Sequence, residues 1–112
     1  MKRHFIYVIG REHGPVKVGI TSSPGSRLST IQTGCPFKID ILHLRECRDR
    51  DHAVEHEASF HDVYSDKRLA GEWFDIEADL AIEGVDCSFD FDEYSEAEAR
   101  RERVAAELNI WQ

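Results

Sequence analysis

The sequence predicts a compact α+β domain, in which a three-stranded antiparallel sheet is flanked by helices in the order β-β-α-β-α. Two short runs of β-branched and aromatic residues open the chain, and two stretches with helical spacing lie on either side of a third such run. A chain of 112 residues with 41% hydrophobic residues can bury one modest core but hardly two. We therefore expect one domain with at most an appendage.

The first two strands are expected over residues 5–9 and 16–20. The link between them is short and contains a Gly-Pro breaker, so an antiparallel hairpin is the simplest connection. Because side chains alternate along a strand, Lys17 and Gly19 share one face of the second strand. A third strand is expected over residues 37–47, where apolar side chains point to both faces.

Two helices complete this pattern. The first is expected to begin near Pro24, after Ser22 or Ser23, either of which can cap it, and to run to about Gln32 and stop near Gly34. The second is expected to begin at Asp49 or Asp51 and to reach about Tyr64.

The C-terminal third is expected to be an appendage. A short helix capped by Asp75 should end at Gly84, which closes the domain over residues 1–84. Residues 85–112 are expected to form an acidic linker, centred on 86–93, and then an amphipathic helix that opens with a capping box. That helix could dock on the domain or bind another copy of the chain or a partner protein.

The net charge of −8 is unusual for a protein that binds phosphate groups. It is unevenly distributed, however. Residues 1–74 hold 11 Lys and Arg against 10 Asp and Glu, a balance of +1, whereas residues 75–112 hold 3 against 12, a balance of −9. The first two thirds can therefore still form a local basic cleft, because the field at a site depends on nearby charges.

Several classes of protein are disfavoured. No run approaches the roughly 18 apolar residues that span a bilayer, and the N-terminus lacks a signal-peptide core, so we expect a cytoplasmic protein without a membrane partner. The three cysteines are an odd number without any Cys-x-x-Cys, which argues against a disulfide framework or a zinc knuckle.

Glu57 is the most informative polar residue. It shares one helix face with Ala53, Phe60 and Tyr64, where an apolar residue would be expected. Since burying an unpartnered carboxylate costs several kcal/mol, Glu57 either pairs with a buried Arg or Lys, or points into a cleft to hold a divalent cation. The helix pattern alone favours neither. His61, one turn later, is either a second partner in this site or one half of a hydrogen-bonded pair.

Five blocks occur in a fixed order over about residues 4–76: Phe5-Ile6-Tyr7, Lys17-Val18-Gly19-Ile20-Thr21, Arg27, the helix residues Glu57, Phe60, His61 and Tyr64, and Gly71-Glu72-Trp73-Phe74. This series resembles the GIY-YIG endonuclease superfamily, specifically its small phage and bacterial branch. The resemblance implies a β-β-α-β-α core whose hairpin carries the two signature tripeptides.

The resemblance also implies a catalytic set. Tyr7 matches the tyrosine that positions or deprotonates the attacking water, Arg27 matches the signature arginine, and Glu57 matches the glutamate that binds Mg²⁺ or Mn²⁺. His61 is expected to assist as a proton shuttle or second-layer partner. Phosphodiester hydrolysis needs positive charge where negative charge accumulates, which the cation and Arg27 would supply. A base role for Tyr7 requires nearby cations to favour its phenolate.

The chain departs from the signature at two positions. Phe5 stands in place of glycine, and Lys17 in place of the second tyrosine. We expect Lys17 to be a site residue that binds phosphate or shifts the pKa of Tyr7. Lys17, Arg27 and Lys38 are the expected nucleic-acid contacts, although simple solvation would explain Lys38 equally well.

The block that ends this series is expected to play a structural part. Trp73 and Phe74 are interpreted as an apolar plug over the sheet rather than as a platform for stacking bases. Glu72 could join the metal site, but an interaction with a backbone amide or a basic side chain is the preferred interpretation.

The predicted function is metal-dependent hydrolysis of nucleic-acid phosphodiesters. DNA is the expected substrate, and RNA stays open because the chain carries no recognisable sequence-reading module. The alternative is a non-catalytic nucleic-acid-binding or regulatory module with the same fold, modulated by the acidic tail. A tail that mimics nucleic acid and screens the cleft is a third hypothesis, which rests on charge alone.

Overall fold

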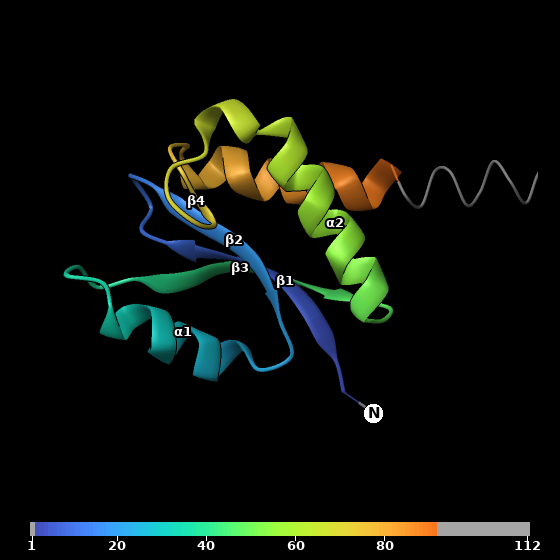
Figure 1. The fold of residues 1–112 in the computed structure, drawn as a ribbon, viewed down its shortest axis with the longest axis horizontal. Helices are drawn as coiled ribbons and strands as arrows, with labels where there is room; N and C mark the ends of the chain where they lie inside the picture. Colours follow the sequence, from blue (N-terminus) through green and yellow to red (C-terminus); the bar gives the residue numbers. More distant parts are fainter. Residues whose placement is uncertain (1, 92–112) are drawn as a thin grey trace, which may run out of the picture.

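The computed structural model describes residues 2–91 and contains a four-stranded antiparallel sheet flanked by three helices (Figure 1). The sheet order is β3-β1-β2-β4. Along the chain the elements are β1 (His4–Gly10), β2 (Val16–Thr21), α1 (Pro24–Thr33), β3 (Asp40–Cys47), α2 (Arg50–Val63), a 3-10 turn η1 (Ser65–Lys67), β4 (Trp73–Phe74) and a helix over residues 78–91. The α+β class and the order of the first five elements are confirmed.

The β1–β2 hairpin sets which side chains meet at the sheet surface. Tyr7 lies opposite Gly19, and Ile9 lies opposite Lys17. Directly opposite residues project to the same face of an antiparallel pair, so these four positions form one patch. The turn between the strands uses Gly14, whose φ of +121° is readily adopted only by glycine.

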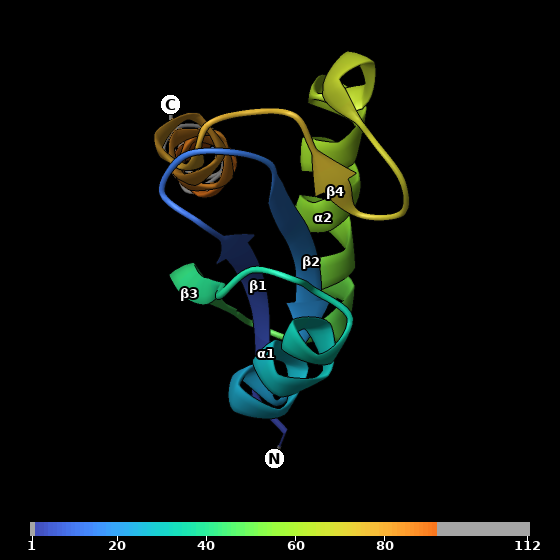
Figure 2. The same cartoon turned by 90° about the vertical axis from the view of Figure 1, so that its left-hand side faces the viewer.

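The two faces of the sheet bury different clusters. On the face covered by α1, Tyr7, Ile9 and Ile39 are buried with Leu28 and Ile31 packed against them. The opposite face is covered by α2 and the 78–91 helix, and its larger core includes Ile6, Val8, Val18, Phe60, Phe74 and Phe89. Figure 2 shows the 78–91 helix end-on and α2 along its side, and residues of both helices belong to this larger core.

The sheet has one strand more than the three expected. Trp73 and Phe74 form β4, which pairs with β2 through Val16 opposite Phe74 and Lys17 opposite Trp73. Phe74 is fully buried, as expected of an apolar plug, but it is held there by strand pairing. Two residues are too few to show an alternating pattern, so β4 left no strand signal in the sequence.

The third strand is shorter than predicted, because β3 begins at Asp40 rather than at residue 37. The preceding residues are bound by the side chain of Gln32 at the end of α1. Its amide nitrogen donates to the Phe37 carbonyl at 2.8 Å, and its oxygen accepts from the Ile39 amide at 2.9 Å. These contacts hold a loop where β-propensity predicted a strand.

The last described helix corrects two expectations. It does not end at Gly84 but continues to Phe91, and residues 86–91 are helical rather than a linker. Val85 and Phe89 are buried in the larger core, at the same helical spacing as the buried Ala81. Gly84 is explained by packing, since a Cβ at this position would lie 2.8 Å from the Tyr64 ring.

Asp86 explains in part why this acidic stretch is ordered. Its carboxylate lies 2.7 Å from His43 Nε2 and accepts a hydrogen bond of 3.0 Å from Arg45 Nη1, both on β3. Burial alone would raise the pKa of Asp86, but these two partners outweigh it and lower the pKa.

The 78–91 helix crosses residue 84. The division of the chain into a domain over residues 1–84 and an appendage over residues 85–112 stays a prediction. The amphipathic helix expected from residue 95 lies outside the described residues.

Two further expectations concern the described part of the chain. None of its helices is long and apolar enough to cross a membrane. Cys35, Cys47 and Cys87 are free cysteines.

Candidate functional site

Tyr7 is the centre of a polar cluster on the α1 face of the sheet. Its side chain is only 1% exposed. The Tyr7 hydroxyl donates to Glu72 Oε2 at 3.2 Å and accepts from Arg27 Nε at 3.2 Å. Nη2 of Arg27 lies 3.7 Å from the same Glu72 oxygen. Three residues far apart in the sequence therefore form one hydrogen-bonded cluster, which we call the Tyr7 cluster (Tyr7, Arg27 and Glu72).

Each member of the Tyr7 cluster comes from a different element. Tyr7 lies on the central strand β1, and Arg27 lies in the first turn of α1. Pro24 is the first residue of that helix, and its fixed φ angle suits this position. Glu72 directly precedes β4, after Gly71 with a φ of +61°. That left-handed residue turns the chain back toward β2, where the Glu72 carbonyl accepts from the Val18 amide at 3.1 Å. The β4 pairing thus places the Glu72 side chain over the hairpin.

Glu57 reaches the same region from α2. Its Oε2 atom is buried and has no hydrogen-bond partner among the described residues. Burial raises the pKa of Glu57, and Glu72 raises it further through its charge and through a hydrogen bond between the two side chains, whereas His61 and a hydrogen bond with the Ile20 backbone lower it. The carboxylate therefore faces another carboxylate, and not the dedicated buried cation that a structural ion pair would need.

Tyr7 is held in its protonated form. Burial is the largest cause and raises its pKa, Arg27 lowers it, and Glu72 raises it again, so that the pKa of Tyr7 reaches about 12. The phenol therefore stays neutral near pH 7 and acts as a donor to Glu72. Of the two roles that the family resemblance implies, positioning fits this pKa, because burial and Glu72 outweigh the effect of Arg27, which favours the phenolate that a base would need.

His61 connects α2 to the edge of β2. Its Nε2 atom lies 2.9 Å from the Val18 carbonyl oxygen. Since a carbonyl can only accept, Nε2 carries the proton and donates it. The ring also packs edge-on against Phe74, with centroids 5.0 Å apart. These contacts tie the helix turn from which Glu57 projects to β2 and β4.

Gly19 lets the Tyr7 cluster approach the strand. A Cβ added here would lie 2.5 Å from the Tyr7 hydroxyl oxygen and 2.6 Å from Glu72 Oε2. No side chain fits in that space without displacing one of the two groups. The signal available in the sequence was a glycine inside a strand, which is typical of close approach by another group.

We predict that Gly19→Ala lowers the free energy of unfolding by about 2 kcal/mol, because the new methyl group overpacks the Tyr7–Glu72 contact. Urea denaturation measures this change. Gly25→Ala is the matched control, since a Cβ there meets nothing within 4 Å and lies in a helix, where alanine is preferred. Equal destabilisation by both substitutions would show that the contact at Gly19 is not the cause.

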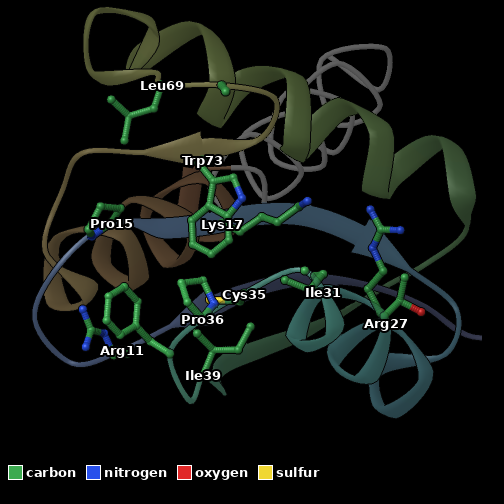
Figure 3. Close-up of a pocket in the computed structure, with 14 residues that line it drawn as sticks. Arg11, Pro15, Lys17, Arg27, Ile31, Cys35, Pro36, Ile39, Leu69 and Trp73 are labelled. Carbon is green, nitrogen blue, oxygen red and sulfur yellow. The ribbon is translucent and has the colours of Figure 1, made fainter.

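Lys17 lies beside the Tyr7 cluster rather than within it. Its Nζ atom is 5.9 Å from the centre of the Trp73 ring. Together with Arg27, it lines a cavity of about 630 Å³ that opens next to the cluster (Figure 3). The structure thus brings together Tyr7, Arg27 and Glu57 around Glu72 and places Lys17 at the adjoining cavity.

Lys38 lies apart from these residues. It is exposed in the loop before β3 and does not line the cavity, although its neighbours Phe37 and Ile39 do. Nucleic-acid contact by Lys38 stays a prediction.

Glu72 is the site residue that the sequence underestimated. It was expected to contact a backbone amide or a basic side chain, and it does pair with Arg27. The same carboxylate also accepts from Tyr7 and faces Glu57, so it connects the whole set. No spacing rule predicts this position, because residues 7, 57 and 72 meet only through the sheet and the β4 turn.

The two glutamates form a partial donor set for a cation. Oxygen atoms of carboxylates are the ligands that Mg²⁺ and Mn²⁺ prefer, and the buried Glu57 oxygen without a partner is a suitable donor. Within residues 2–91, no group of three or more His, Cys, Asp and Glu side chains is arranged to hold a metal ion. A cation here would therefore complete its shell with water or substrate oxygens, as Mg²⁺ usually does.

Comparison with known proteins places the sequence in a family. No curated protein and no solved structure matches the chain. The T5orf172 domain matches residues 4–88, which include every residue of the cluster and both glutamates. This phage-associated domain suggests a nuclease or another nucleic-acid-related function. Because the match covers well over half of the sequence, the chain belongs to the T5orf172 domain family.

Proposed function

We propose that this protein is a divalent-metal-dependent endonuclease that hydrolyses phosphodiester bonds of DNA, with an active site of the GIY-YIG type. The observation that carries the proposal is the buried, unpartnered Glu57 oxygen beside Glu72, next to the Tyr7 cluster. Glu57 is the desolvated member of this pair, and two carboxylates that face each other are costly unless a cation or a proton lies between them. Buried ionisable groups with a shifted pKa and a specific charged neighbour are typical of functional sites.

Glu57 and Glu72 are the residues that would hold Mg²⁺ or Mn²⁺. The bound ion would supply positive charge to the phosphate group and lower the pKa of a coordinated water. The fit is good chemically, because both glutamates supply hard oxygen ligands and the Oε2 atom of Glu57 has no hydrogen-bond partner among the described residues.

The remaining site residues have separate tasks in this proposal. Arg27 lies at the junction between the cluster and the cavity, where its guanidinium can stabilise negative charge that develops on the phosphate. Tyr7 stays protonated and orients Glu72, and through its hydroxyl it can orient a water molecule. Lys17 contributes a second positive charge for the substrate backbone, and His61 holds α2 in register with β2.

The decisive experiment is a cleavage assay with the purified full chain. Supercoiled plasmid, branched DNA, single-stranded DNA and RNA are incubated with increasing Mg²⁺ or Mn²⁺. We expect nicking or cutting that requires the metal and is lost in Glu57→Ala. Glu55→Ala is the matched control, because Glu55 lies on the same helix but is exposed.

Two results would contradict the proposal. One is the absence of cleavage of all four substrates with either metal. The other is nucleic-acid binding that is indifferent both to metal and to Glu57→Ala, which would instead favour a non-catalytic binding module.

A further inference from the structure

The cavity beside the Tyr7 cluster has walls of two kinds. Figure 3 shows Lys17 and Trp73 on one side of it and Ile31, Pro36 and Ile39 on the other, with Arg27 at one end and Arg11 at the opposite end. Its volume of about 630 Å³ falls in the range of small-molecule sites. The walls are thus largely apolar, and each end carries a guanidinium.

The charge of the cavity is opposite to that of the chain. Arg11, Lys17 and Arg27 line it, and its lining includes no Asp or Glu among the described residues. The chain as a whole has a net charge of −8. Three cations around an apolar space select a ligand that combines negative charge with a flat or apolar body.

Two aromatic side chains supply surfaces for such a body. Phe37 is 54% exposed in the loop before β3, and the Arg11 guanidinium lies 4.2 Å from the centre of its ring. Trp73 faces the cavity from β4, with Lys17 beside it. Aromatic rings next to cations are the arrangement by which proteins stack nucleobases and bind the attached phosphates.

We propose that this cavity binds one unpaired nucleotide of the substrate strand, with the base against Phe37 and Trp73 and the backbone phosphate near Lys17 and Arg27. The inference rests on the proposed nuclease function. Arg27 both contacts Tyr7 and lines the cavity, so a strand bound in the cavity would pass Arg27 on its way to the carboxylates. A paired base is not available for such stacking. The preferred substrate is therefore single-stranded DNA or a duplex with an unpaired nucleotide.

Binding of fluorescently labelled oligonucleotides in EDTA tests the inference without cleavage. The probes are a ten-nucleotide single strand, the same strand with abasic sites, the matching duplex and a free mononucleotide as competitor. The wild-type protein should bind the single strand about tenfold more tightly than the abasic strand, which is the effect expected from stacking of one base. Phe37→Ala should abolish this preference. Phe91→Ala, which removes another exposed phenylalanine ring (72% exposed) on the 78–91 helix, should keep it.

The outcomes separate this inference from the proposed function. Equal affinity for the intact strand, the abasic strand and the duplex, with metal-dependent cleavage present, would overturn the cavity assignment alone. Competition by the mononucleotide as strong as that by the strand would overturn the assignment to a nucleotide within a strand. Loss of cleavage in every assay would contradict the nuclease proposal itself. Circular dichroism of Phe37→Ala checks that the fold is retained.

Discussion

Replacing Glu57 with glutamine is expected to stabilise the metal-free protein while lowering the cleavage rate at least about 100-fold. The glutamine keeps the shape of the side chain but removes the negative charge that faces Glu72. The gain in the free energy of unfolding should be about 1 kcal/mol at pH 7.5 in EDTA, because a neutral amide costs less to bury beside Glu72 than a charged carboxylate does. Stability and activity therefore change in opposite directions.

The pH dependence of this effect has a definite sign. Burial and Glu72 raise the pKa of Glu57 in the folded state above its ordinary value of 4.5. The folded protein therefore protonates Glu57 more readily than the unfolded chain does. The stability that this protonation contributes is fully present below pH 4.5. It is lost as the pH rises through the folded-state pKa. The wild-type protein should thus lose stability as the pH rises from 4.5 through the folded-state pKa of Glu57. Glu57→Gln has no carboxyl group at this position and should not show that loss.

Thermal unfolding measured from pH 4 to pH 8, with EDTA or with Mg²⁺, checks this prediction. A gain of about 1 kcal/mol corresponds to a rise in Tm of roughly 5 °C for a domain of this size. Mg²⁺ should stabilise wild type and leave Glu57→Gln unchanged. Glu55→Gln serves as the control, since Glu55 is exposed on the same helix. A Glu57→Gln protein that is less stable than wild type at pH 7.5 in EDTA would show that the glutamate is satisfied after all.

Removing the Arg27 side chain is expected to lower the cleavage rate by about 100- to 1,000-fold, the usual loss when a charge-stabilising donor is deleted. Arg27 donates to Tyr7 through Nε and approaches Glu72 through Nη2. Without it, no guanidinium lies between the carboxylates and the cavity, and Tyr7 loses the donor that orients its hydroxyl. The rate constant under saturating Mg²⁺ is the measurement.

A lysine at position 27 distinguishes charge from geometry. Its ammonium can replace the charge but not the two-armed contact with Tyr7 and Glu72, so Arg27→Lys should recover about a tenth of the wild-type rate or less. Arg50→Ala, an exposed change at the start of α2, should retain the wild-type rate. Full activity of Arg27→Lys would mean that only the positive charge at this position matters.

The regular elements of this domain were largely predictable because their signals are local. The hairpin, α1 and α2 follow from β-branched runs, from Pro24 and from the capping residue Asp49, whose side chain accepts from the His52 amide at 2.8 Å. β4 was not predictable, since a strand of two residues exists only through its pairing with β2. The 78–91 helix was interrupted in the prediction because Gly84 resembles a helix end, whereas it is required by the Tyr64 ring.

The candidate site was predictable only in part. Glu57 was found from its position on a core-facing helix stripe, and Tyr7 and Arg27 from their match to a series of sequence blocks; the structure places all three around Glu72. Three features were not evident from the sequence. They are the position of Glu72 between the other site residues, the close approach of side chains to Gly19, and the cavity without acidic residues. Each of these depends on side chains from different elements, which no pattern within one element can relate.

The sequence by itself determined the α+β class, the order of the main elements and the presence of a carboxylate on an apolar helix face, because these follow from periodicity, capping and composition along a continuous segment. Only the tertiary structure decided that this carboxylate faces Glu72, that Tyr7 is held as a neutral phenol with a pKa of about 12, and that the cavity beside them is cationic. The physical reason is that desolvation and Coulomb interactions depend on distances through space. Tyr7 and Glu72 are 65 residues apart in the chain, yet their side chains meet at 3.2 Å once β4 has paired with β2.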